Sequence, residues 1–258
     1  MLYASSYLNK EGIATSLFAC GAQGEAGSAK EALDGASAVI LPIPATRDGV
    51  NLNAPNRADP LPLADLSDII GADIPVFVGK PNAGALKIFG SRGIVCRDYA
   101  AQPFYAETNA AYTVEGALAL AAGKYPKAIC ECRVSVLGAG NIGKRLSGAL
   151  KALGAKVTLF SRSERDRAYT RYLGMNDCGY GDAAAVLPFC DMIFNTVPDG
   201  EIAACLAYAG KNSLVVDLAG VVCECDNVIK ALALPSKYSP QSAGELIART
   251  VIGMGGFV

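Results

Sequence analysis

The sequence of 258 residues contains no histidine. A chain without imidazole can have no histidine general acid or base, no Ser-His-Asp triad and no histidine-ligated metal site. The histidine that usually acts in 2-hydroxy-acid dehydrogenases is excluded for the same reason. Any chemistry of this chain must therefore depend on other side chains or on a cofactor.

Charged residues are scarce at 18%, whereas hydrophobic residues make up 52%. This balance favours folded domains with large cores, and the length suffices for two of them. The formal net charge is −1 and no basic tract interleaved with aromatic residues occurs, so we expect no nucleic-acid partner. The start of the sequence does not resemble a signal peptide, and no apolar run could span a bilayer. We therefore expect a cytoplasmic protein without a membrane partner.

The nine cysteines are an odd number, which argues against a disulfide framework in a cytoplasmic chain. Two pairs, Cys130/Cys132 and Cys223/Cys225, have C-x-C spacing rather than C-x-x-C. Zinc or an iron–sulfur cluster is one interpretation of these pairs, but buried thiols are the favoured one. We expect no metal site.

Residues 133–162 carry the strongest pattern of the chain. An apolar strand over residues 134–137 leads into Gly138-Ala139-Gly140-Asn141-Ile142-Gly143, and a helical pattern follows until Gly154. A second strand over residues 156–160 closes the unit. A G-x-G-x-x-G motif between a strand and a helix is typical of dinucleotide-binding Rossmann units. The alternative is a glycine-rich turn in another kind of α/β domain.

Each glycine of the motif has an expected role in a dinucleotide site. Gly138 makes the tight turn, Gly140 lets the backbone approach a pyrophosphate, and Gly143 lets the helix lie close to the sheet. Asn141 and Ile142 begin the helix, whose unpaired N–H groups attract negative charge.

The end of the second strand predicts which dinucleotide binds. An NAD site usually has Asp or Glu there, which binds the ribose 2′-OH. This chain has Ser161-Arg162-Ser163 instead, and an arginine with two hydroxyls can bind a 2′-phosphate. The pattern predicts NADP(H) as the cofactor. The alternative is that Arg162 only points to solvent.

Two later strands are expected to supply more of the cofactor site. The strand over residues 192–194 runs into Asn195-Thr196-Val197-Pro198, and the strand over residues 214–216 runs into Asp217-Leu218-Ala219. Both loops follow the carboxyl ends of sheet strands, where α/β proteins bind ligands. We expect them to face the same crevice as the glycine motif.

The first 100 residues alternate between helix and strand, which predicts a small parallel sheet. The patterns predict helices over residues 1–9, 29–33, 63–70 and 83–89, and strands over residues 15–20, 38–41, 75–79 and 94–97. Residues 46–62 are polar and interrupted by proline, so we expect a long loop where a ligand could bind.

An alanine-rich helix over residues 109–124 leads into the Rossmann unit, and residues 242–254 form a last helix. We therefore predict an N-terminal substrate domain, a bridging helix with linker, a Rossmann NADP-binding domain and a C-terminal helix, over residues 1–108, 109–130, 131–240 and 241–258.

Several blocks of the chain, in order, make it similar to the family of dipicolinate synthase A subunits, over most of its length from about Ala38 onward. The YTVEGALALA helix is the most specific block, because the Rossmann blocks occur in many dehydrogenases. The blocks are residues 112–121, 134–157, 194–198, 215–219 and 234–247.

The resemblance implies a flavodoxin-like N-terminal α/β domain followed by a Rossmann domain. It implies oxidation of a dihydrodipicolinate-type cyclic dicarboxylate to dipicolinate with NADP+, during sporulation, jointly with a flavoprotein-like B subunit. A chain without histidine suits this chemistry, since aromatisation supplies driving force and the protein mainly positions a ring carbon against the nicotinamide.

The candidate catalytic residues are Glu115, as polar anchor or weak base, and its neighbour Thr113. A dicarboxylate needs cations or N–H donors, and the candidates for substrate binding are Pro42, Arg47, Lys80, Ser242 and Ala243. Arg47 and Lys80 could instead be solvated charges, and Glu115 a helix-surface carboxylate. We expect the active site to lie between the domains.

Two departures from the family pattern concern the substrate end of the site. The span from Asp217 to Leu234 is short, and the usual L-P-G block appears as Leu234-Pro235-Ser236. Two alternatives therefore stay open: another two-domain Rossmann dehydrogenase of the alanine or shikimate dehydrogenase type, or a nucleotide-binding partner subunit without catalysis. A homo-oligomer is also open.

The start of the chain prompts a separate hypothesis. A flavodoxin-like domain begins with a strand inside its sheet, yet the first element expected here is a helix. We therefore expect the N-terminal domain to lack its first strand, which leaves the strand over residues 38–41 with an unpaired edge. This domain should be the less stable one and prone to pairing with another chain.

Overall fold

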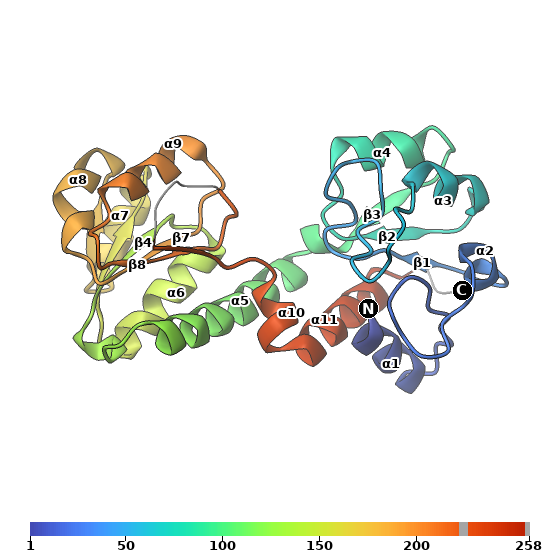
Figure 1. Ribbon diagram of the computed structural model, residues 1–258, viewed down its shortest axis with the longest axis horizontal. Helices are drawn as coiled ribbons and strands as arrows, with labels where there is room; N and C mark the ends of the chain where they lie inside the picture. The colour runs from blue at the N-terminus through green and yellow to red at the C-terminus, as the bar shows by residue number, and fades with distance from the viewer. Residues whose placement is uncertain (222–226, 256–258) are drawn as a thin grey trace. The chain divides into compact units, whose positions relative to one another are not determined.

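The computed structural model describes residues 1–221 and 227–255, and the pair Cys223/Cys225 lies outside them. The chain forms two compact units. Unit 1 comprises Met1–Asn109 together with the C-terminal residues from Pro240, and unit 2 comprises Ala110–Ser239. Figure 1 colours the chain from blue to red in sequence order, so that unit 1 contains both the blue and the red ends.

Unit 2 is built on a six-stranded parallel sheet with the order β6-β5-β4-β7-β8-β9. From β4 the strand order runs outward to β5 and β6 on one side and to β7, β8 and β9 on the other. This is the Rossmann arrangement, so the predicted fold class is confirmed. The strands are β4 (Arg133–Leu137), β5 (Lys156–Phe160), β6 (Asn176–Cys178), β7 (Met192–Asn195), β8 (Leu214–Asp217) and β9 (Val228–Lys230).

The two outer strands of this sheet, β6 and β9, have no counterpart in the sequence prediction. Both are short, and Asn176, Asp177 and Lys230 interrupt their apolar character. An edge strand is exposed along one side and needs no continuous apolar run, so it leaves little pattern. The central strands β4, β7 and β8, by contrast, are almost wholly buried and were predicted within a residue or so.

The helices of unit 2 cover this sheet. Helix α6 packs Leu146 and Leu150 into the core beneath β4 and β5. The helices are α5 (Pro103–Lys124), α6 (Asn141–Ala152), α7 (Glu164–Tyr172), α8 (Ala183–Val186), α9 (Gly200–Ala203) and α10 (Leu234–Tyr238), with short 3-10 turns at Ile129–Glu131, Tyr180–Asp182, Leu187–Phe189 and Ala204–Tyr208. Helix α5 begins six residues earlier than predicted, with Pro103 in its first turn, where proline costs no hydrogen bond.

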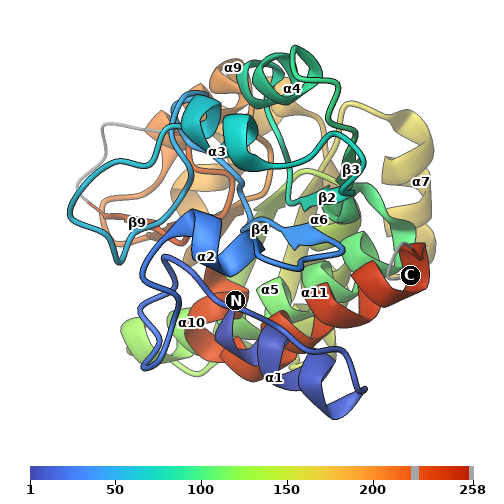
Figure 2. The same cartoon turned by 90° about the vertical axis from the view of Figure 1, so that its right-hand side faces the viewer.

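Unit 1 contains a three-stranded parallel sheet in the order β1-β2-β3. The central strand β2 is fully buried, and helices lie on both faces, α3 and α4 on one and α1 and α11 on the other (Figure 2). The elements are α1 (Leu2–Lys10), α2 (Ala29–Leu33), β1 (Val39–Ile40), α3 (Leu63–Ile69), β2 (Val76–Val78), α4 (Ala83–Gly90), β3 (Cys96–Asp98), a 3-10 turn (Tyr99–Ala101) and α11 (Pro240–Met254).

The C-terminal helix α11 is part of unit 1 and lies beside α1 (Figure 1). A Cβ on Gly244 would lie 2.6 Å from the Cβ of Tyr3 and 2.9 Å from the backbone nitrogen of Ala4. The two helices therefore approach closely because the residue at position 244 has no side chain. The two ends of the sequence form one packed pair.

The strand predicted over residues 15–20 is wrong. Instead, the backbone N–H groups of Cys20, Gly21 and Ala22 donate to one oxygen of the Glu25 carboxylate, at 2.9, 3.0 and 3.3 Å, and Ala19 has a left-handed backbone. A strand needs a neighbour to pair with, and β1, at the edge of the sheet, is hydrogen-bonded to β2 alone among the described strands. The residues that precede it, Leu2–Lys10, are helical as predicted. The hypothesis of a missing strand stays a prediction.

Among the described residues, no helix combines the length and the apolar character that crossing a bilayer requires.

Candidate functional site

The turn between β4 and α6 has room for no side chain at two of its glycines. Gly138 has a left-handed φ of 105°, and a Cβ there would lie 2.5 Å from Val197 Cγ2 and 2.6 Å from Thr196 Oγ1. A Cβ on Gly143 would collide with the carbonyl oxygen of Gly138. Both roles predicted for these glycines, the tight turn and the close helix approach, match this geometry.

Gly140 differs from the other two glycines because nothing lies within 4 Å of the place where its Cβ would be. It precedes α6, and no side chain within residues 1–221 and 227–255 caps the first N–H groups of that helix. Open space next to uncapped N–H groups at the start of a twelve-residue helix suits a pyrophosphate. The residues Asn141, Ile142 and Gly143, predicted for the cofactor site, form this first turn.

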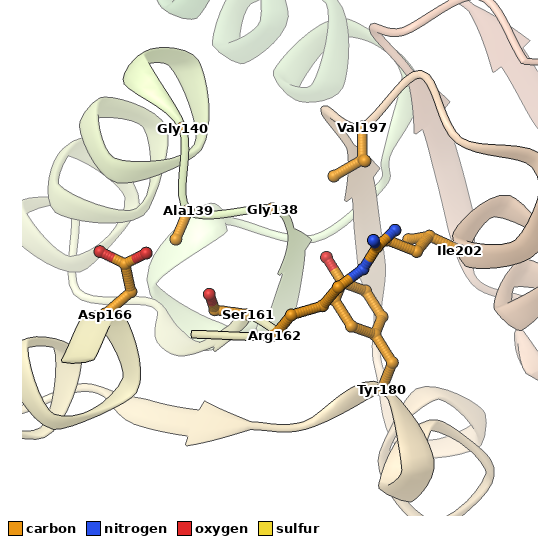
Figure 3. Close-up of a pocket in the computed structure, with 9 residues that line it drawn as sticks. All are labelled: Gly138, Ala139, Gly140, Ser161, Arg162, Asp166, Tyr180, Val197 and Ile202. Atoms are coloured by element: carbon orange, nitrogen blue, oxygen red, sulfur yellow. The ribbon is translucent and has the colours of Figure 1, made fainter. Parts of the chain in front are cut away.

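A pocket of about 370 Å³ opens beside this turn, at the carboxyl ends of β4 and β5. Arg162 extends across it toward Ile202, while Asp166 lies on the opposite side near Ala139 (Figure 3). Its lining consists of Gly138, Ala139, Gly140, Ser161, Arg162, Asp166, Tyr180, Val197 and Ile202. The structure thus brings five predicted residues together here: Gly138, Gly140, Ser161, Arg162 and Val197.

Other predicted cofactor residues do not line the pocket but form hydrogen bonds that hold one of its lining loops in place. Asn195 and Asp217 are fully buried neighbours at the ends of β7 and β8, and Asn195 Nδ2 donates to Asp217 Oδ1 at 3.0 Å. Asn195 Oδ1 in turn accepts from the Val197 N–H at 3.1 Å, and Thr196 Oγ1 donates to the Leu137 carbonyl at 2.8 Å. These bonds fix the loop that carries Val197.

The remaining predicted residues of these loops have similar supporting contacts. Asp217 Oδ1 also accepts from the N–H groups of Ala219 at 3.1 Å and Gly220 at 3.2 Å. Leu218 packs against the core of unit 2, and Pro198 continues the loop towards α9. Ser163 caps α7 by accepting from the Asp166 N–H at 3.3 Å.

Each of two cations around the pocket is paired with an aspartate. Arg162 donates to Asp199 at the start of α9, and Lys144 of α6 lies 2.7 Å from Asp166 of α7. The Arg162 guanidinium, together with the N–H groups that the carboxylate caps, holds the pKa of Asp199 below its usual range. Burial raises the pKa of Tyr180, which also lines the pocket, to about 12.

The carboxylate of Asp166 was not anticipated in the pocket. No acidic residue follows β5 directly, but the first turn of α7 brings Asp166 back beside Ser161. The S-x-x-D spacing of Ser163 and Asp166 is typical of the start of a helix, and this pattern could have predicted where Asp166 lies. Tyr180 could not be found this way, because it follows the unpredicted strand β6.

In unit 1 the loops that follow β1 and β2 pack against each other. The Ala45 N–H donates to the Gly79 carbonyl at 2.8 Å, and a Cβ on Gly79 would lie 2.8 Å from the Pro42 carbonyl oxygen. The structure therefore brings the loop that carries Pro42 and Arg47 next to the one that carries Lys80.

The two candidate cations on these loops are held differently. Arg47 Nε donates to Asn53 Oδ1 at 3.2 Å, whereas Lys80 is exposed and has a left-handed backbone, with φ 49°. The Lys80 N–H donates to Asp98 Oδ1 at 3.1 Å. Non-glycine residues in this conformation are strained and are enriched at functional sites.

The other candidates lie on two helices. Glu115 is exposed and Thr113 is buried on α5, in unit 2. Ser242 and Ala243 are half-buried in the first turn of α11, in unit 1. Their catalytic and substrate-binding roles, and a site between the units, stay predictions.

The fold and the glycine turn define a Rossmann dinucleotide-binding protein with a second α/β unit. Residues 108–206 match the family described as D-isomer specific 2-hydroxyacid dehydrogenase, NAD binding domain, which indicates a nicotinamide dinucleotide cofactor. Residues 2–100 match the family described as the N-terminal domain of the dipicolinate synthase A subunit. The resemblance to dipicolinate synthase A subunits that the sequence predicted is confirmed, since residues 2–100 match the N-terminal domain of that family.

Solved structures show the same fold. The A subunit of dipicolinate synthase from Bacillus halodurans has a TM-score of 0.83 at 21% identity, covering 98% of this chain and 93% of that one. The A chain of dipicolinate synthase from Bacillus subtilis has a TM-score of 0.81 at 22% identity, covering 98% and 91%. An L-alanine dehydrogenase has a TM-score of 0.57 at 14% identity, covering 90% and 72%. A search of curated protein sequences found no match.

Proposed function

We propose that this chain is the NADP-dependent oxidoreductase subunit of a dipicolinate synthase, which oxidises a dihydrodipicolinate-type cyclic dicarboxylate to dipicolinate. The observation that carries the proposal is the combination, in one chain, of the N-terminal domain of the A-subunit family with the Gly138–Gly143 turn and the Arg162 pocket. The cofactor supplies hydride acceptance at the nicotinamide ring; the protein has to bind, orient and exclude water.

The geometry of unit 2 suggests how the dinucleotide would lie. The pyrophosphate would lie against Gly140, where the N–H groups at the start of α6 are uncapped. The adenosine end would occupy the pocket between Ser161 and Val197, with Arg162 close enough to pair with a 2′-phosphate. The other end would then continue towards the loops after β7 and β8, which the Asn195–Asp217 hydrogen bond holds rigid.

The two carboxylates of the substrate would bind to unit 1. Arg47 and Lys80 are the cationic candidates on its adjacent loops, and the first turn of α11, with Ser242 and Ala243, offers N–H groups. Oxidation removes a hydride and a proton from the ring; Glu115 would receive the proton, and the Thr113 hydroxyl would donate a hydrogen bond to a substrate carboxylate. The exposed position of Glu115 leaves its carboxylate accessible for this role.

The same proposal includes the setting of the reaction. A flavoprotein-like B subunit would act with this chain, in the cytoplasm of a sporulating cell, since the family's name designates an A subunit and so suggests a second kind of chain. The alternatives are a dehydrogenase of the alanine or shikimate type and a binding subunit without catalysis.

The test is NADPH formation from the dihydrodicarboxylate precursor, measured with and without the B subunit. We expect reduction of NADP+ that depends on the precursor and is lost in Gly143→Val, whereas Gly148→Ala on the same helix should retain it. L-alanine and shikimate serve as competing substrates. Turnover of either of these but not of the precursor, or no turnover with the B subunit present, would contradict the proposal.

A further inference from the structure

The ion pair between Arg162 and Asp199 connects two loops on either side of the dinucleotide pocket. Arg162 follows β5, and Asp199 lies after the loop that follows β7. The Arg162 side chain extends across the pocket towards Ile202 (Figure 3), and its guanidinium donates to Asp199 Oδ2. The arginine on which a 2′-phosphate would depend is therefore already paired with an anion.

The two partners differ in how firmly they are held. Asp199 is the N-cap of α9, and its other carboxylate oxygen accepts from the Glu201 N–H at 2.9 Å. Its side chain is 32% exposed, whereas the long side chain of Arg162 is 65% exposed. The carboxylate thus has a fixed position, and Arg162 is the partner that must move when the pair opens.

The second pair at the pocket has a different geometry. Lys144 and Asp166 come from the first turns of α6 and α7, and Asp166 lines the pocket on the side of Ala139 (Figure 3). A ribose hydroxyl can donate to such a carboxylate without displacing any cation. A 2′-phosphate is mostly a dianion at neutral pH and would be repelled by it.

We propose that Asp199 is a specificity-determining residue of this site, because it competes with the 2′-phosphate of NADP(H) for Arg162. This inference rests on the proposed function, in which Arg162 binds that phosphate. A cofactor with a 2′-hydroxyl binds without opening the pair. A 2′-phosphate must exchange with Asp199 and then lies close to its negative charge, so the preference for NADP(H) is smaller than Arg162 alone would provide.

The experiment measures the dissociation constants of NADPH and NADH, with adenosine 2′,5′-bisphosphate and 5′-AMP as minimal probes, for the full chain. Asp199→Asn removes the charge but keeps the helix cap, since asparagine caps helices as well as aspartate. We expect NADPH and the bisphosphate to bind about threefold to tenfold more tightly, with NADH and 5′-AMP unchanged. The gain should shrink as salt concentration rises.

Two further variants make this result specific. In an Arg162→Gln background, the gain from Asp199→Asn should be smaller, because the competition for Arg162 is gone and only the direct repulsion between Asp199 and the phosphate remains. Glu131→Gln is the charge control: this exposed residue precedes β4, at the end of the sheet away from the pocket, and its loss should leave both affinities unchanged.

The outcomes separate the two proposals. If Arg162→Gln weakens NADPH binding but Asp199→Asn leaves it unchanged or weaker, the competition by Asp199 is overturned and the NADP assignment stands. If Arg162→Gln leaves NADPH binding unaltered, Arg162 does not bind the phosphate, and both the assignment and the inference fail.

Discussion

The two units of this chain share one kind of architecture but differ in how many strands their sheets contain and how fully those strands are paired. Both have parallel strands covered by helices, but within the described part of the chain the sheet of unit 2 has six strands and that of unit 1 has three. Strand β4 has hydrogen-bonded neighbours on both sides along its whole length, whereas β1 spans two residues at a sheet edge. Unit 1 depends more on its helices, including the pair formed by α1 and α11.

The edges at the carboxyl ends of the strands also differ between the units. In unit 2 the strand ends surround a pocket whose charged side chains are paired, Lys144 with Asp166 and Arg162 with Asp199. In unit 1 the loops after β1 and β2 pack on each other, and Lys80 projects from a strained backbone.

Gly143→Ala should cause the largest loss and would test whether unit 2 depends on the close approach of α6 to β4. The new Cβ would collide with the Gly138 carbonyl, so we expect unit 2 to lose about 3 kcal/mol or more of unfolding free energy and the protein to lose NADPH binding. Gly148→Ala is the matched control in the same helix: its Cβ meets nothing within 4 Å, and it should stabilise by about 0.5–1 kcal/mol. Equal stabilities for the two variants, measured by denaturant unfolding, would contradict the role of Gly143.

Gly244→Ala should break the packing of α11 on α1 and so weaken unit 1 alone. We expect a loss of about 1–3 kcal/mol, because the Cβ would lie 2.6 Å from Tyr3 Cβ. Gly253→Ala, later in the same helix and with nothing within 4 Å, should not destabilise. Thermal unfolding should show an earlier transition for Gly244→Ala, with NADPH binding by unit 2 retained. Loss of NADPH binding at temperatures below that transition would show that the units are not independent.

Amide hydrogen exchange tests the expectation that unit 1 is the less stable one. Wild-type hydrogen exchange should be faster for the amides of β1 than for those of β4, since a short edge strand opens more readily. Slower exchange in β1 would reverse the comparison.

Arg162→Asp should weaken NADPH binding about tenfold or more while sparing NADH, since a charged hydrogen bond is lost and a like charge is added. Arg145→Asp, on the exposed face of α6, introduces the same change of charge outside the pocket lining and serves as control. Equal wild-type affinities for NADPH and NADH, by fluorescence titration, would argue against the NADP assignment.

The smallest effect should come from Asp191, where α5, β4 and β7 meet at the end of unit 2 away from the pocket. The Arg133 N–H, at 2.8 Å, is the main cause of its lowered pKa, with Tyr125 and Lys127 contributing. A depressed carboxyl pKa contributes stability that is present above the pKa of the unfolded chain and is lost as pH falls through the folded value. Asp191→Asn should therefore lower stability at neutral pH and flatten its fall below about pH 4. Exposed Asp182→Asn should leave this acid dependence unchanged in urea unfolding curves.

The local sequence pattern predicted those parts of this protein that are buried along their whole length or that have a backbone conformation only glycine adopts. The strand–glycine–helix unit around Gly138 to Gly143 could be recognised because only glycine tolerates that turn and that approach, and β4, β7 and β8 are apolar because both their faces are covered. The alanine-rich sequence likewise predicted helix α5, and the family blocks predicted the resemblance.

Tertiary structure alone decided what depends on neighbours distant in sequence. Residues 15–20 have strand-like composition but pair with no strand among the described residues, whereas the short segments β6 and β9 become strands because β5 and β8 offer them an edge. Asp199 becomes the partner of Arg162 only when the loops that follow β5 and β7 meet beside one pocket. Hydrogen-bond pairing and charge pairing both require a partner in space, and no local pattern specifies that partner.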